Sequence, residues 1–374
     1  MSVNAELGMP STAPRRSRAL QSNLTPGPTR AHRRSHNEVI GVSTVTETEP
    51  PREAATCQRC RSALAEADRF CPSCGLPTTL RKTPWYRHTW WRIFIIGLFL
   101  YFLTFNLLAQ SGNPNFVTTV IMLGAFLVPV TFVAYLYETH ALFDVSPVAV
   151  ALTFLYGGVL GTVAAQLLEA KLVLNMGLIG MLAVGVSEEI AKPIGLVWLA
   201  RRRECADEMH GIVLGAAAGM GFAALETMGY ALTYLIMSRG NLDVLGMVLI
   251  NRGLLSPLAH GTWTAILAGT LWRERLPDGR FRITFAVIKA YLLVVLLHAL
   301  WDWTSSQIPI QVTLPGIDIG WRFFDIMIPQ INLPIPGLLI GLWGLIVLVR
   351  MLREARRQTR RPDAPVAGVE PAAA

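Results

Sequence analysis

The fold of this protein is decided by residues 173–199, which form one long apolar stretch, VLNMGLIGMLAVGVSEEIAKPIGLVWL. A helix of about 20 apolar residues is long enough to cross the hydrocarbon core of a bilayer. This stretch nevertheless contains Glu188, Glu189 and Lys192, and charged side chains are costly in lipid and usually functional there. The stretch therefore predicts a membrane-spanning helix that carries a polar site.

Similar apolar runs follow one another along most of the chain. They lie near 93–110, 116–137, 147–168, 211–237, 243–271, 283–304 and 332–350. The chain is 52% hydrophobic and 16% charged, with a mean hydropathy of +0.42, which exceeds the apolar content of a water-soluble domain. We therefore predict an all-α polytopic membrane protein with about eight transmembrane helices.

Basic residues gather in alternate loops between these runs. Such residues accumulate on the cytoplasmic side of a membrane, so we expect a multi-pass plasma-membrane protein with both termini in the cytoplasm. The same loops account for the net charge of +8, and we expect no binding of nucleic acid. The basic residues are Arg81, Lys82, Arg87, Arg92, Arg201, Arg202, Arg203, Arg273, Arg275, Arg280, Arg282, Arg350, Arg353, Arg356 and Arg357.

The chain divides into four regions. Residues 1–55 are rich in Ser, Thr, Pro, Arg and Ala and are predicted to be disordered. Residues 56–77 contain a cysteine module, residues 90–351 form the membrane domain, and residues 352–374 form a basic, disordered cytoplasmic tail.

The cysteine module contains two CxxC pairs, Cys57 with Cys60 and Cys71 with Cys74, separated by ten residues. Two such pairs offer four thiolates to a tetrahedral zinc ion. A disulfide within a CxxC pair is strained, and the cytoplasm is reducing. We therefore predict a zinc ribbon whose ion is structural, because all four ligand positions are filled.

Polar residues in four of the predicted spans lie at one depth. Glu188, Glu226, His260 and His298 are each 13 to 16 residues from the nearest charged or histidine residue at the cytoplasmic edge. At about 1.5 Å per residue, this places them about 20 to 24 Å below that edge. Polar residues that only join neighbouring helices need not agree in depth, so we expect one shared site.

Helical spacing predicts which of these groups pair. Glu188 and Lys192 are at i,i+4, Glu189 and Lys192 at i,i+3, and His298 and Asp302 at i,i+4, so each pair shares a helical face.

Proline and glycine residues mark further local features. Pro193 is expected to kink or open its helix beside the carboxylates. Ser256-Pro257 is typical of an N-cap followed by the first helical position, which would put His260 in the first turn of a helix that begins inside the membrane. Gly211, Gly215 and Gly219 form a smooth stripe that allows close approach of another helix.

A buried set of carboxylates and imidazoles can activate water in two ways. A glutamate can act as the general base, or histidines and a carboxylate can hold a catalytic zinc. The sequence has no HExxH motif, and both routes stay open. Two alternatives involve no hydrolysis: an ion- or proton-coupled transporter, and an inactive membrane scaffold whose zinc ribbon binds a partner. The chain shows no internal repeat, which disfavours the transporter.

Four segments resemble motifs of the PrsW family of intramembrane proteases, within the superfamily of CAAX-processing and bacteriocin-processing proteases. Glu188–Lys192 is similar to its EExxK motif, and Phe222–Glu226 is similar to its FxxxE motif. Arg252–His260 resembles its R…SPxxH stretch, and His298–Asp302 resembles its final HxxxD. The four occur in the expected order on four different spans.

The resemblance implies hydrolysis of peptide bonds in membrane-anchored substrate proteins, typically single-span regulatory proteins such as anti-sigma factors. It implies that Glu188 activates water, that Glu189 and Glu226 support it, and that His260 and His298 bind or polarise the carbonyl. The supporting residues are Lys192, Arg252 and Asp302.

Overall fold

The structure is a computed structural model in which most of the membrane domain is described. The described residues are 56–57, 62–64, 73, 88–140, 145–173, 177–199, 207–276, 278–308, 310–321 and 324–360. The predicted region 1–55 lies outside them, as do Cys60, Cys71 and Cys74. Around Cys57, Thr56 and Ala63 form an antiparallel bridge, and the Cys57 N–H donates to the Ser62 carbonyl at 2.9 Å. The ribbon zinc stays a prediction.

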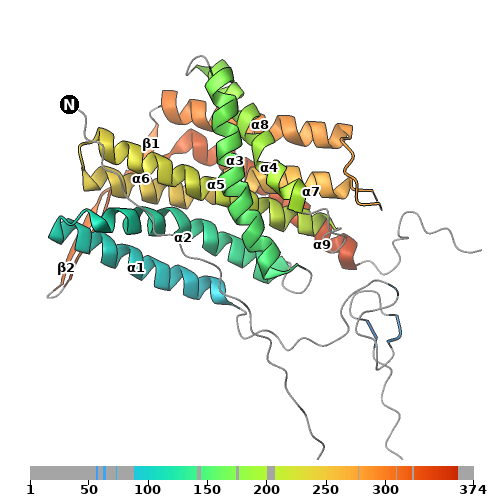
Figure 1. Ribbon diagram of the computed structural model, residues 1–374, viewed down its shortest axis with the longest axis horizontal. Helices are drawn as coiled ribbons and strands as arrows, with labels where there is room; N and C mark the ends of the chain where they lie inside the picture. Colours follow the sequence, from blue (N-terminus) through green and yellow to red (C-terminus); the bar gives the residue numbers. More distant parts are fainter. Residues whose placement is uncertain are drawn as a thin grey trace, which may run out of the picture. The chain divides into compact units, whose positions relative to one another are not determined.

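The described membrane domain is built mainly from nine α-helices (Figure 1). Their bounds are α1 Thr89–Ser111, α2 Asn115–His140, α3 Pro147–Leu172, α4 Leu178–Leu199, α5 Glu208–Met237, α6 Leu242–Leu255, α7 His260–Arg273, α8 Phe285–Gln307 and α9 Ile335–Arg360. The polytopic helical fold predicted from the apolar runs is confirmed.

Seven segments of the described chain are long and apolar enough to cross a membrane: α1, α2, α3, α5, the α6–α7 pair, α8 and α9. The helix α4 stands apart because its 22 residues include Glu188, Glu189 and Lys192. All three side chains are buried, and α4 packs against α3 and α8. The polar side chains of α4 therefore face the interior, while apolar residues such as Ile190 and Ile194 cover its exposed face.

The helix α5 lies at the centre of the helical bundle, between α3 and α7 (Figure 1). The predicted glycine stripe is its contact with α7. A Cβ at Gly211 would lie 2.6 Å from the Trp272 Cβ, and a Cβ at Gly215 would lie 2.5 Å from the Ala268 Cβ. At Gly219 a Cβ would overlap the carbonyl oxygen of His260. Close approach at this stripe therefore places the start of α7 against α5.

The predicted span 243–271 is broken in its middle. The helix α6 ends at Leu255, a short 3-10 helix, η1, covers Ser256–Leu258, and α7 begins at His260. His260 therefore opens a helix inside the bundle, as expected. The predicted cap was wrong, because the Ser256 hydroxyl donates to the Gly253 carbonyl at 2.9 Å, and Ala259 is the residue that precedes α7.

Four strands connect α8 to α9, between the predicted spans 283–304 and 332–350, and the last strand takes up the start of the second span. They are β1 Gln311–Leu314, β2 Ile317–Trp321, β3 Phe324–Ile328 and β4 Ile331–Pro334. β1 pairs with β4 and β2 with β3, both antiparallel, in one continuous register: Leu314 faces Ile331 and Ile317 faces Ile328. The hairpin is joined to the bundle at α6, where the Asn332 N–H donates to the Asn251 Oδ1 at 3.1 Å.

The structure differs from the sequence predictions at the end of α9 and at Pro193 in α4. The helix α9 continues through Arg360, so the predicted tail at 352–374 begins inside a helix, and residues 361–374 lie outside the described residues. The helix α4 runs without a break through Pro193. The proline therefore removes one N–H from the helix without opening it.

Candidate active site

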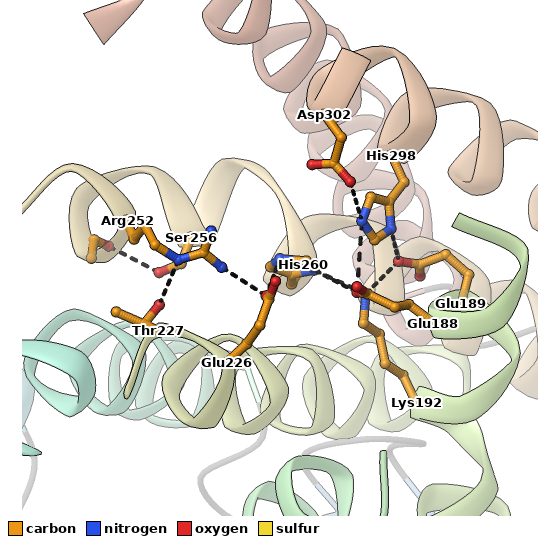
Figure 2. A network of polar contacts seen from close by, with 11 residues as sticks. Glu188, Glu189, Lys192, Glu226, Thr227, Arg252, Ser256, His260, His298 and Asp302 are labelled. Atoms are coloured by element: carbon orange, nitrogen blue, oxygen red, sulfur yellow. Dashed lines mark hydrogen bonds and ion pairs between the residues drawn. The ribbon is translucent and has the colours of Figure 1, made fainter. Parts of the chain in front are cut away.

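Polar side chains of five helices meet in one network inside the bundle (Figure 2). These helices follow one another along the chain, and their polar groups join through contacts of 2.5 to 3.8 Å. The residues are Glu188, Glu189 and Lys192 of α4, Glu226 of α5, Arg252 of α6, His260 of α7, and His298 and Asp302 of α8.

Lys192 connects the carboxylates of its own helix with α7. Its ammonium lies 2.5 Å from the Glu189 Oε1 and 3.1 Å from the Glu188 Oε2, which are the i,i+3 and i,i+4 pairs predicted from spacing. The ammonium also lies 2.9 Å from the His260 Nδ1. Sequence spacing could not show this third contact, because it joins two helices.

The two ring nitrogens of His298 both face carboxylates. Its Nδ1 lies 2.9 Å from the Glu189 Oε1, and its Nε2 lies 3.2 Å from the Asp302 Oδ2, the i,i+4 partner predicted from spacing. The Glu188 Oε2 is 3.6 Å from the same Nε2. The imidazole is therefore oriented by carboxylates of both α4 and α8.

A second chain of contacts leads from His260 to α6. The His260 Nε2 lies 3.0 Å from the Glu226 Oε2, and the same oxygen lies 2.8 Å from the Arg252 Nη2. The Arg252 Nε donates to the Thr227 hydroxyl at 3.3 Å, and its guanidinium lies 4.1 Å from the centre of the Tyr230 ring. Arg252 thus holds the carboxylate that faces His260.

These contacts decide the tautomer of His260. A lysine ammonium has only donors, so the His260 Nδ1 must accept from Lys192. The Nε2 then carries the proton and faces the Glu226 Oε2 at 3.0 Å. The lone pair of Nδ1 consequently points toward Glu188 and Glu189, where the lysine nitrogen lies.

The network becomes more exposed from α4 toward α6. The side chains of Glu189 and Lys192 are 0% exposed, and that of Glu188 is 7% exposed. Glu226 and Arg252 reach 20% and 29%. Asp302 of α8 is 32% exposed, so the site has a buried inner part at α4 and more accessible outer parts at α5, α6 and the Asp302 side of α8.

Aromatic rings enclose the inner part. The Trp263 ring lies 4.9 Å from the His298 ring and 5.6 Å from the His260 ring, and the Phe222 ring lies 5.5 Å from the His260 ring. The sequence analysis did not single out Trp263, Thr227 or Tyr230. Trp263 lies three residues after His260, on the same helical face, and that spacing is a signal that could have found it.

Four of these residues form a group that can hold a metal ion. Glu188, Glu189, His260 and His298 are all buried, and each offers one ligand atom within 4.8 Å of the others. Carboxylate oxygens and imidazole nitrogens are ligands of catalytic zinc. The Glu189 Oε2 is buried and has no hydrogen-bond partner among the described residues, so it can still accept a ligand. The donor set therefore fits a metal.

The eight membrane residues singled out from the sequence thus lie in one connected cluster. The sequence analysis predicted one shared site because four of these residues lie at a similar depth in their spans. The predicted ribbon ligands Cys60, Cys71 and Cys74 lie outside the described residues, so the structure describes no metal centre there.

Comparison with known proteins agrees with the geometry. No curated protein and no solved structure matches the chain. The family described as PrsW family intramembrane metalloprotease matches residues 112–328, which include the eight clustered residues. A buried glutamate and histidine cluster inside apolar helices is suited to hydrolysis within a membrane. The chain therefore belongs to the PrsW family of intramembrane metalloproteases.

Proposed function

We propose that Glu188 is the general base with which this protease hydrolyses membrane-anchored regulatory proteins of the anti-sigma type. The observation that carries the proposal is the buried group of Glu188, Glu189, His260 and His298 in a chain of this family. Membership of the family favours proteolysis over a transporter or an inactive scaffold.

The surroundings of the three glutamates support the choice of Glu188. The Glu189 Oε1 is held by both Lys192 and His298 at 2.5 and 2.9 Å and is fully buried. Glu226 is held by Arg252 and His260. Glu188 has looser contacts of 3.1 to 3.8 Å and a slightly exposed side chain, so it is the best placed to take a proton from water.

The remaining residues orient the imidazoles. Glu226 faces the His260 Nε2, and Glu189 and Asp302 face the two nitrogens of His298. Carboxylates in such positions set the tautomer and the ring orientation of a histidine. Glu188 can then accept the proton of the attacking water beside two imidazoles that are fixed in place.

A metal held by this group would lower the pKa of a bound water and polarise the carbonyl. Glu188, Glu189, His260 and His298 are the residues that would hold it. Glu226 and Asp302 are outside this group and would keep their contacts with the two imidazoles.

The test is cleavage of a co-expressed single-span substrate by the Glu188→Gln variant. This change keeps the size of the side chain and removes its basicity, so cleavage should fall at least about 100-fold. The protein should still insert and accumulate. The matched control is Glu138→Gln, a half-buried glutamate of α2 that accepts from the Thr89 N–H at 2.9 Å. Cleavage at the parent rate by Glu188→Gln would contradict the assigned role.

A further inference from the structure

The ammonium of Lys192 lies inside the group that can hold a metal. It is within 3.1 Å of ligand atoms of Glu188, Glu189 and His260, three of the four members of that group. It uses the Nδ1 lone pair of His260 and carboxylate oxygens of both glutamates. A divalent ion held by ligand atoms that lie within 4.8 Å of one another would lie beside the ammonium, so the two cations compete for one position.

We propose that Lys192 is a built-in cation that occupies the metal position of the metal-free enzyme and must leave it when a divalent ion binds. The proposal rests on the proposed function for its consequence, since it describes how the same site changes between an inactive and an active form. Two positive charges cannot share a dry cage of this size, because repulsion is weakly screened where the side chains are fully buried.

The type of side chain supports this role. The chain has 33 basic residues, of which only four are lysines, at positions 82, 171, 192 and 289. An ammonium is a compact point charge that fits a cage for a single ion, whereas a guanidinium is larger and planar. A chain that otherwise uses arginine thus has lysine at the one position inside the group.

The surroundings also offer the displaced ammonium a place beside the cage. Its nitrogen already lies 4.5 Å from the centre of the Phe222 ring, a cation–π distance. The stem of a lysine is flexible, so the ammonium can leave the carboxylates while it keeps its contact with this ring.

Metal binding to full-length variants tests the proposal. In a background in which Cys57, Cys60, Cys71 and Cys74 are serine, zinc affinity is measured by equilibrium titration of the detergent-solubilised, metal-stripped protein. Lys192→Met removes the competing charge and keeps the stem. It should bind zinc at least tenfold more tightly than the parent background.

The matched control is Lys289→Met. Lys289 is exposed, and its ammonium also lies over an aromatic ring, 5.0 Å from the centre of the Phe285 ring. The zinc affinity of this control should equal that of the parent background.

The thermal unfolding of the metal-free proteins gives a second readout. Without the ammonium, two buried carboxylates have no cation, so metal-free Lys192→Met should melt at a lower temperature than its parent, and zinc should restore it. If this variant does not fold, Lys192→Gln, which is neutral and can still donate to Glu189, replaces it in both measurements.

The proposal is overturned if the Lys192 variants bind zinc equally well or more weakly than the parent. It is also overturned if neither the parent nor the variants bind zinc. These outcomes leave the Glu188→Gln test untouched, because it measures cleavage. Conversely, unchanged cleavage by Glu188→Gln would contradict the role of that glutamate without altering the zinc affinities. The two hypotheses can therefore fail separately.

Discussion

At the scale of single residues, the outer half of the site depends on Arg252. Its guanidinium contacts the Glu226 carboxylate at 2.8 Å, donates to the Thr227 hydroxyl and lies against the Tyr230 ring. Glu226 in turn faces the His260 Nε2 at 3.0 Å. Arg252 touches none of the four residues that can hold a metal, so it acts by positioning Glu226.

We expect Arg252→Ala to reduce cleavage of a single-span substrate by about 10- to 100-fold, the usual effect of losing an outer partner of a site. Arg252→Lys should recover only part of this loss, because an ammonium cannot bind the carboxylate and the hydroxyl in a planar fork. The measurement is the initial cleavage rate in detergent. Arg280→Ala is the control, since Arg280 forms an exposed pair with Asp278. Full activity of Arg252→Ala would argue against the positioning role.

At the scale of elements, the contact between α5 and α7 places His260. Gly219 lies where any side chain would overlap the His260 carbonyl, and Gly211 and Gly215 continue the same stripe. The start of α7 is thus located by the lack of side chains on α5. The position of an imidazole in the site depends on a packing surface of another helix.

Gly219→Ala should therefore lower both stability and activity. Overpacking of a tight contact costs about 1 to 3 kcal/mol, and α7 can relieve it only by moving His260. The control is Gly229→Ala on the same helix, where a new Cβ would meet nothing within 4 Å. Thermal unfolding and cleavage rates measured side by side check the prediction. A Gly219→Ala protein that melts and cleaves like the Gly229→Ala protein would contradict it.

At the scale of the whole molecule, ion pairs and hydrogen bonds tie helix ends together at one end of the bundle. Arg273 at the end of α7 pairs with Glu208 at the start of α5, and the start of α1 is bound to Glu138 near the end of α2. Arg356 of α9 donates to His140 of α2. These are the ends that border the arginine-rich segments, so we propose that this end faces the cytoplasm.

Labelling of single cysteines tests this orientation. In a background without the five native cysteines, Ser111→Cys lies exposed at the end of α1, and Asp278→Cys lies exposed between α7 and α8. A membrane-impermeant maleimide should modify Ser111→Cys in intact cells and Asp278→Cys only after lysis. The reverse pattern would mean that the termini lie on the other side of the membrane.

The sequence by itself determined the features that depend on local pattern. Apolar length predicted the helical spans, and helical spacing predicted the pairs of Lys192 with Glu188 and Glu189 and of His298 with Asp302. Distance from the charged edge predicted that four spans bring polar groups to one depth. These inferences succeed because rise and period are the same in every α-helix.

Only the tertiary structure decided which groups meet across helices. It placed the Lys192 ammonium on the His260 Nδ1 and the Arg252 guanidinium on Glu226. It also showed the hairpin between α8 and α9, whose strands are four or five residues long and give too short a pattern to recognise. The depth of a residue along its helix follows from counting residues. The rotation of each helix about its axis and the choice of its neighbouring helices depend on how small residues such as Gly219 let the helices pack.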